Sequence, residues 1–188
     1  LGDVGVSTSP DAYSIHWNPA KSAFLESQAG FAFSYVPWLR ALVNDMNLAY
    51  LSGYAKVNKI STVGASFRYF SLGNITFTSE AGDVIRDFKP SEFALDGSYA
   101  IKLSKQMSSG VSLRYVYSNL TGGSTVAGAS TKPGQSVAFD FGTYYTSKKF
   151  KLGTKKGKLN LGFNISNVGN KMTYTDNNKE DFLPSNLR

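Results

Sequence analysis

Large apolar side chains alternate with small or polar ones along seven segments of this 188-residue chain. In the segment 92–104, one set of alternate residues is apolar and comprises Phe93, Leu95, Tyr99, Ile101 and Leu103. The other set is polar and comprises Glu92, Asp96, Ser98 and Lys102. Successive side chains of a β-strand point to opposite faces, so such a strand has one apolar surface and one wet surface with charges at mid-strand.

We predict seven strands of this kind, at 28–36, 46–56, 60–72, 92–104, 108–119, 136–147 and 157–166. The second is the least regular, because Leu51 breaks its alternation. Aromatic-rich apolar faces on long strands are typical of an antiparallel outer-membrane β-barrel that faces lipid. A soluble lipocalin-like binder would turn its apolar side chains inward, and the mid-strand charges oppose that alternative. Helical periodicity is weak except in the short segment 37–45.

The composition excludes several other classes of protein. Hydrophobic residues make up 41% of the chain and the mean hydropathy is −0.21, so no helical membrane protein is indicated. No run approaches the roughly 18–20 apolar residues that a spanning helix requires. Cysteine is absent, which rules out disulfides and thiolate metal sites. One histidine and scattered carboxylates do not make a metal site, and we expect neither a metal nor a cofactor.

The net charge is +7, but the lysines gather in short connections and form no stripe with interleaved aromatic residues. Nucleic-acid binding is therefore not expected. The most basic connection, SKKFKLGTKKG at 147–157, carries Lys148, Lys149, Lys151, Lys155 and Lys156. We interpret it as a solvated turn, with the binding of acidic headgroups or of a partner as the alternative.

The connections between the predicted strands alternate in length. Those after the second and fourth strands are short, whereas 73–91 and 120–135 are long and rich in Gly, Ser and Thr. Bacterial barrels have short periplasmic turns and long extracellular loops, so we expect the first strand to run outward. Such barrels close with an even number of strands from about eight upward. Seven strands and a tail are too few, and we expect this chain to be the front half of a larger barrel.

Four sequence blocks in order resemble a known family. The blocks are HWNPAK at 16–21, YVPWLR at 35–40, LVND at 42–45 and RYFSLGNITF at 68–77. They follow a Gly-rich start and an Asp-Ala pair, which is similar to the start of FadL-type barrels, and LPSNL at 183–187 continues the similarity. Together they resemble the PorV (LptO) family of outer-membrane components of the type IX secretion system. The resemblance covers the front half of that family.

This resemblance implies a FadL-like barrel of about fourteen strands in the outer membrane of a Gram-negative cell. It implies that residues 1–27 fold into the lumen as a plug and that 28–188 form part of the barrel wall. Members of this family are not catalysts. They bind secreted cargo through its C-terminal signal domain at the SprA-type translocon barrel, and deliver it to the PorU-type sortase complex. The alternative function is a FadL-like channel for hydrophobic small molecules, which would share the fold but not the partners.

Four residues of the expected plug, His16, Trp17, Asn18 and Pro19, precede the first strand. The residue before a proline is held extended and Asn tolerates turns, so the Asn-Pro pair is expected to direct the chain from the plug into that strand. A serine hydrolase would need the histidine together with a serine such as Ser14 and an acid such as Asp11. Nothing in the sequence fixes the geometry that such a site requires, and we expect no enzymatic activity.

Alternation places four charges, Arg68, Asp96, Arg114 and Asp140, on the inward face. On the lipid face, a charge would cost roughly 2–4 kcal/mol at the membrane midplane. We interpret the four as a luminal salt-bridge lattice, and a transport path for a ligand is the alternative. Trp38 lies at the outer end of the first strand, where it belongs either to an interfacial aromatic girdle or to a contact with a partner barrel.

The long connection 73–91 contains five apolar side chains, Ile75, Phe77, Val84, Ile85 and Phe88. Clustered apolar side chains in a loop indicate burial against something. They either fold over the barrel mouth or contact cargo or the translocon, and the sequence leaves both alternatives open.

Overall fold

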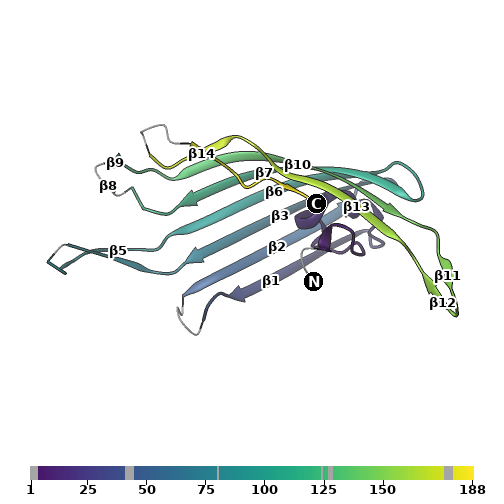
Figure 1. Cartoon of the computed structure of the whole chain (residues 1–188), viewed down its shortest axis with the longest axis horizontal. Coiled ribbons are helices and arrows are strands. Elements are labelled where there is room, and N and C mark those ends of the chain that lie inside the picture. Colours follow the sequence, from purple (N-terminus) through teal and green to yellow (C-terminus); the bar gives the residue numbers. More distant parts are fainter. Residues whose placement is uncertain (1–3, 41–44, 80, 124, 127–128, 176–179) are drawn as a thin grey trace.

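The computed structural model describes residues 4–40, 45–79, 81–123, 125–126, 129–175 and 180–188. Its main feature is one antiparallel sheet of eight strands in the order β1-β2-β3-β6-β7-β10-β13-β16 (Figure 1). These strands are β1 (Ala29–Pro37), β2 (Met46–Lys56), β3 (Ser61–Leu72), β6 (Ser91–Lys102), β7 (Met107–Asn119), β10 (Gly134–Thr146), β13 (Asn160–Gly169) and β16 (Asn186–Leu187). The edge strands β1 and β16 do not pair with each other, so the described sheet is open.

Four two-stranded hairpins extend from the ends of these strands. They are β4 (Ile75–Thr78) with β5 (Val84–Phe88), β8 (Thr125–Val126) with β9 (Ala129–Ser130), β11 (Phe150–Leu152) with β12 (Lys155–Gly157), and β14 (Lys171–Thr173) with β15 (Glu180–Phe182). We call the end of the sheet that carries β4–β5 and β8–β9 the loop end (Figure 1). The opposite end, with β11–β12 and the short turns 57–60 and 103–106, is the turn end.

The predicted all-β, antiparallel class is confirmed, and each of the seven predicted strands lies on a strand of the sheet. The hairpins were missed, because strands of two to five residues contain too few alternations for a period of two to be recognised. The tail that follows the seven predicted strands contains β16. The helical periodicity expected at 37–45 falls partly outside the described residues, at 41–44, and the part that is described contains no helix.

The N-terminal segment lies against one face of the sheet, which we call the inner face (Figure 1). It contains three short helices, η1 (Val4–Val6), α1 (Ser14–Trp17) and η2 (Pro19–Phe24), and η2 packs on β6, β7 and β10. Asn18 sets the start of η2, because its side chain accepts a hydrogen bond from the Ala20 N–H at 3.0 Å. Pro19 takes the first helical position, where a missing N–H is tolerated. Among the described residues, no helix is both long and apolar enough to cross a membrane.

Glycines allow this segment to lie directly on the sheet backbone. A Cβ atom at Gly110 in β7 would stand 2.5 Å from the Ala20 nitrogen, and one at Gly162 in β13 would collide with the Val6 carbonyl oxygen. Any larger residue at either position would push the segment away from the sheet.

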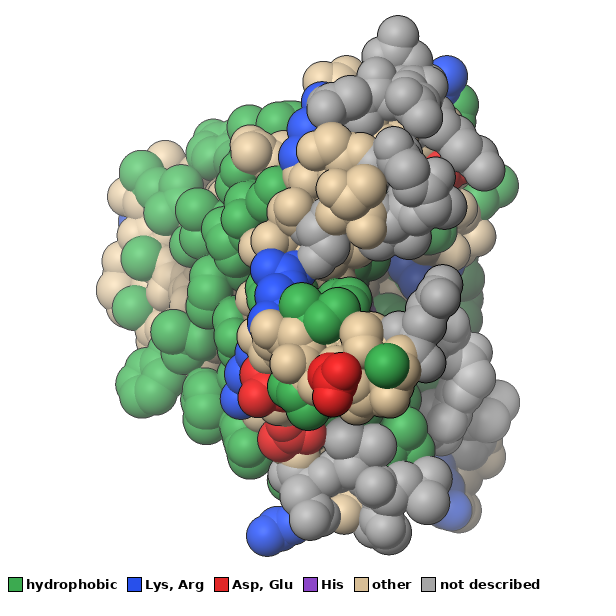
Figure 2. Space-filling model, turned by 90° about the vertical axis from the view of Figure 1, so that its left-hand side faces the viewer, with side chains coloured by type: hydrophobic (Ala, Val, Ile, Leu, Met, Phe, Trp, Pro, Cys, Tyr) green, Lys and Arg blue, Asp and Glu red, His purple; other side chains and the backbone are tan. Residues whose placement is uncertain are grey.

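The two faces of the sheet have opposite characters. The inner face carries buried small and polar side chains, including Ser52, Thr62, Ser66, Asp96, Ser112, Arg114, Asp140 and Asn164. The opposite, outer face carries large apolar side chains that are 38–81% exposed, including Phe31, Phe33, Leu51, Phe67, Leu95, Leu113, Phe139, Phe141, Leu161 and Phe163. Figure 2 shows hydrophobic side chains gathered along one side of the molecule. Burial is therefore inverted relative to a soluble sheet, which covers its apolar face.

Candidate functional site

A polar network crosses the inner face at mid-sheet, with the guanidinium of Arg114 at its centre. Its Nε donates to Asp96 Oδ1 at 2.5 Å, and its Nη2 donates to Asp140 Oδ2 at 3.0 Å. Both carboxylates are buried, with side chains only 2% exposed. Ser66 Oγ donates to the second oxygen of Asp96 at 2.8 Å. Buried charges are tolerated only when they are paired and hydrogen-bonded, and this cluster meets both conditions.

Asn167 in β13 completes the network through a β-bulge. The pairing of β10 with β13 changes register beside it, and its φ of 61° is a left-handed conformation that Asn adopts more readily than most residues. Its N–H donates to Asp140 Oδ1 at 2.8 Å, and its side-chain oxygen accepts from Arg114. Its Nδ2 donates to the Pro184 carbonyl at 2.8 Å. The network thus links β3, β6, β7, β10 and β13 to the C-terminal residues.

Arg68 connects the inner face of β3 to the N-terminal segment. Its Nη2 lies 2.6 Å from His16 Nδ1, and its guanidinium carbon lies 5.4 Å from the centre of the Tyr50 ring. The His16 ring also makes edge contacts with Trp17 and Tyr50, with ring centres 4.8 and 6.0 Å apart. The Arg68 guanidinium therefore contacts both His16 and the ring of Tyr50 where α1 meets the sheet.

Burial, followed by the positive charges of Arg68 and Arg114, lowers the pKa of His16 to about 4. The imidazole is therefore neutral near pH 7, and because a guanidinium can only donate, Nδ1 accepts from Arg68. The other residues considered for a hydrolase face each other, since Ser14 Oγ lies 3.2 Å from Asp11 Oδ1. The His16 ring forms its polar contact with Arg68, whereas Ser14 bonds to Asp11.

Lys21 ties the N-terminal segment together and was not singled out from the sequence. It is 1% exposed, and its Nζ donates to the Gly5 carbonyl and to Thr8 Oγ1, each at 2.9 Å. Burial lowers the pKa of Lys21, and the charge of Asp11 acts in the opposite direction. The signal available in the sequence was a lysine inside an otherwise small and apolar stretch, NPAKSA.

Other residues of the expected plug also form contacts on the inner face. Asn18 Nδ2 donates to the Thr143 carbonyl in β10 at 2.9 Å and to the Val6 carbonyl at 3.2 Å. The ring of Trp17 lies beneath the Arg188 guanidinium, at 5.6 Å. The structure therefore brings His16, Trp17 and Asn18 together on the inner face, near the charged network.

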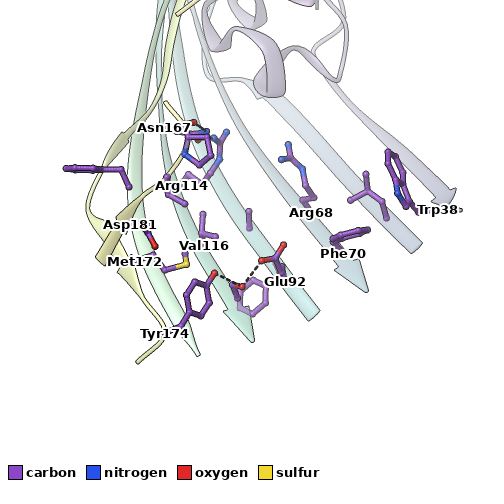
Figure 3. A pocket seen from close by; sticks show the side chains of 17 residues that line it. Trp38, Arg68, Phe70, Glu92, Arg114, Val116, Asn167, Met172, Tyr174 and Asp181 are labelled. Atoms are coloured by element: carbon purple, nitrogen blue, oxygen red, sulfur yellow. Dashed lines mark hydrogen bonds between the residues drawn. The ribbon is translucent and has the colours of Figure 1, made fainter. Parts of the chain in front are cut away.

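A cavity of about 620 Å³ opens on the inner face toward the loop end (Figure 3). Its apolar lining includes Leu48, Phe70, Val116, Met172 and Pro184. Arg68 and Arg114 also line it, so the cavity combines an apolar wall with two guanidinium groups. We call this space the loop-end cavity.

A hydrogen-bond chain crosses the loop-end cavity (Figure 3). Tyr174 OH donates to Ser118 Oγ at 2.9 Å, and Ser118 Oγ donates to Glu92 Oε1 at 2.6 Å. Tyr174 follows β14 and was not singled out from the sequence. Trp38 lines the same cavity and is 47% exposed. The backbone N–H of Trp38 donates to the Met46 carbonyl at 2.9 Å, which fixes the chain just beyond the end of β1.

The β4–β5 hairpin contains the five apolar loop residues, and an arginine packs two of them. The Arg86 guanidinium lies over the rings of Phe77 and Phe88, at 5.0 and 5.5 Å. It also donates to the carbonyls of Thr121 and Gly122, at 2.7 and 3.3 Å. The hairpin is therefore anchored to the next connection at the loop end.

The remaining apolar residues of this hairpin are open to solvent. Val84 and Ile85 are each 66% exposed, and Ile75 is 44% exposed. In Figure 1 the hairpin that carries them extends beyond the loop end of the sheet. The hairpin presents aliphatic side chains on an anchored support.

Comparison with known proteins identifies one family. The family model described as "Type IX secretion system protein PorV" matches residues 1–188, which is the whole chain. No curated protein matches the chain.

Proposed function

Because the chain belongs to the PorV family and thus has a role in the type IX secretion system, we propose that it binds secreted cargo in the outer membrane. It engages the C-terminal signal domain of the cargo at the SprA-type translocon barrel and passes the cargo to the PorU-type sortase complex. It acts as an adaptor between these partners and not as a catalyst.

The outer face supports a position within the membrane. Large apolar side chains cover it at high exposure, whereas charges lie on the inner face. Lipid tails would cover the outer face without leaving any charge in hydrocarbon. Toward the loop end of this face, the centre of the Phe93 ring lies 5.1–6.1 Å from those of Phe67, Tyr115 and Tyr117. Such an aromatic cluster resembles the aromatic girdle at the surface of a bilayer.

We assign the open sheet to the wall of a FadL-like barrel of about fourteen strands. The support is the meander of antiparallel neighbours, with the hairpins β4–β5 and β8–β9 at one end, and the short turns 57–60 and 103–106 beside the β11–β12 hairpin at the other. The N-terminal segment on the inner face would be the luminal plug, and the loop end would face outward. Trp38 would then lie at the outer mouth of the barrel, beside the translocon.

The observation that carries the adaptor function is the exposure of Val84 and Ile85 on an anchored hairpin. Exposed apolar patches on a protein surface mark sites of interaction with a partner. The Arg86 contacts hold the hairpin in place before binding, which reduces the conformational entropy lost on association. Cargo and translocon are the partners that the family implies for such a surface.

The test is the double substitution Val84→Ser and Ile85→Ser, in protein inserted into outer membranes. We expect capture of a purified C-terminal signal domain, or of the translocon, to fall about tenfold, because two buried aliphatic contacts would be lost. The matched control is Val57→Ser with Ile60→Ser, at the turn end, where both residues are also exposed aliphatics. Unchanged capture of both partners by the hairpin variant would refute this contact.

The loop-end cavity favours a second candidate function, a channel or binder for hydrophobic small molecules. Its apolar lining also carries charges of both signs, from Arg68, Arg114, Glu92 and Asp181, which suits an amphipathic ligand. The substitution Phe70→Glu would distinguish the two functions. It would reduce ligand uptake if the cavity binds the ligand, and it would leave cargo capture unchanged if the adaptor function depends on the hairpin.

A further inference from the structure

The turn end contains a second cavity, of about 710 Å³, which the proposed function does not use. Four lysines line it, Lys105, Lys148, Lys149 and Lys158. Tyr54, Tyr144, Gln106 and Ser147 add polar atoms, and Glu26 is the acidic residue in its lining. We call this space the turn-end cavity.

The β11–β12 hairpin adds more positive charge beside the turn-end cavity. Lys151 lies directly opposite Lys156 in the hairpin, and both side chains are exposed. Like charges directly opposite each other destabilise a two-stranded ribbon. Among the described residues, no carboxylate forms an ion pair with these two lysines or with the four in the cavity. The described part of the chain thus concentrates six lysines here, while Glu26 is the acidic residue in the lining and forms no ion pair with them.

We propose that the turn-end cavity and the β11–β12 hairpin bind an acidic segment of a partner polypeptide. Lysine ammonium groups on flexible stems can follow the carboxylates of an extended chain, and the hydroxyl and amide groups in the lining can bond to its backbone. The complementarity of charge would speed association as well as select the partner.

The position of the cavity favours a polypeptide over a lipid headgroup. Tyr144 and Phe24 line it, and both belong to the inner-face packing of β10 and η2, with ring centres 5.9 Å apart. The apolar outer face, which lipid would cover, lies on the opposite side of the sheet. If the loop end faces outward, as the proposed function has it, the partner is periplasmic. The selectivity for acidic chains does not depend on that orientation.

The experiment measures fluorescence anisotropy of a short labelled peptide of alternating Glu and Ser, with the detergent-solubilised chain at low ionic strength. A Gln–Ser peptide is the neutral control. We expect the acidic peptide to bind, the neutral one not to bind, and affinity to fall as salt screens the charges. Lys149→Gln with Lys158→Gln should weaken binding about fivefold, since each exposed ion pair contributes modestly.

The matched control is Lys59→Gln with Lys89→Gln, which removes the same charge from two exposed lysines outside the cavity. Equal weakening by both variants would reduce the effect to net charge and overturn the proposal. So would the absence of acidic-peptide binding, or lysine-dependent binding of phosphatidylglycerol micelles without peptide binding. Heat-dependent gel mobility verifies that each variant is folded. Cargo capture, assayed separately, should be unchanged in the Lys149→Gln/Lys158→Gln variant, so failure here is distinguishable from failure of the adaptor function.

Discussion

The outer and inner faces of the eight-stranded sheet are built from the same strands but meet different surroundings. On the outer face, Phe31 is 81% exposed and Leu113 is 59% exposed, whereas on the inner face Asp96 and Asp140 are at most 2% exposed. A soluble protein would hide the first pair, because apolar burial contributes about 25 cal/mol per Å². The difference shows that the outer face must be covered by something outside the described chain, whereas the N-terminal segment of the chain covers the inner face.

Cohesion on the two faces therefore has different sources. Packing on the inner face depends on directional bonds, such as those from Arg114 to Asp96 and Asp140. On the outer face most of the large side chains are apolar and need only tolerate an apolar solvent, although Tyr115 OH donates to Gln135 Oε1 there at 2.8 Å. Substitutions that remove a charge from the inner face or add one to the outer face should therefore change stability by different amounts.

The largest expected effect follows from Arg114→Met. It leaves two buried carboxylates without their partner, and removal of one member of a buried ion pair costs about 3–5 kcal/mol. We expect the urea midpoint of unfolding from lipid vesicles to fall accordingly, with tryptophan fluorescence as the readout.

The variant Arg114→Met combined with Asp96→Asn and Asp140→Asn removes the charges together and is the control. It should regain part of the lost stability, because no uncompensated charge remains in the interior. If the triple variant is less stable than Arg114→Met alone, the network does not act through charge pairing.

A smaller loss of stability is expected when a lysine is introduced on the outer face of a strand, and a still smaller one when it is introduced on the inner face of the same strand. Leu113→Lys on the outer face of β7 should destabilise by about 2–4 kcal/mol, because it places a charge in hydrocarbon. Val116→Lys, three residues along on the inner face, lines the loop-end cavity and should cost much less. Heat-dependent gel mobility after insertion into vesicles measures both. Equal losses would contradict the assignment of the outer face to lipid.

The smallest expected effect concerns pH at the junction of the inner face with the N-terminal segment. The pKa of His16 is lowered to about 4, so the unfolded chain takes up its proton first as the pH falls. Stability is therefore fully present above about pH 6.5 and declines toward pH 4, by about 1 kcal/mol between pH 7 and 5.5. His16→Gln keeps an acceptor for Arg68 and should flatten this part of the profile. A profile that is identical in both proteins would mean that other groups cause the decline.

Much of the sheet was predictable because its alternation is long. The seven long strands have nine to thirteen residues, which repeat the period of two often enough for it to be recognised; they are β1, β2, β3, β6, β7, β10 and β13. Charges at mid-strand identified which of the two faces is polar. Leu51, which interrupts the alternation of β2, lies on the outer face, and Tyr50 takes the inner position beside Arg68. A pattern that sorts residues only into apolar and polar cannot predict that an aromatic side chain such as Tyr50 lies on the polar face.

The candidate site was less predictable, because its contacts join distant parts of the chain. Alternation placed Arg68 on the inner face, but nothing in the sequence paired it with His16, 52 residues away. Asn167 reaches Arg114 only because a bulge turns its backbone to a φ of 61°. Tyr174 reaches Ser118 across 56 residues. Local patterns indicate which way a side chain points, but not which side chain it meets.

The glycine contacts beneath the N-terminal segment have a consequence for the order of assembly. Asn18 bonds to the carbonyl of Thr143, 125 residues later in the chain, and the segment also rests on Gly110 and Gly162. The surface that receives it exists only after β7, β10 and β13 have paired. Contacts so distant in sequence form late, since the loops between them must close first. The residues that are synthesised first are thus among the last to reach their final positions, because the strands must pair before the N-terminal segment can dock on them.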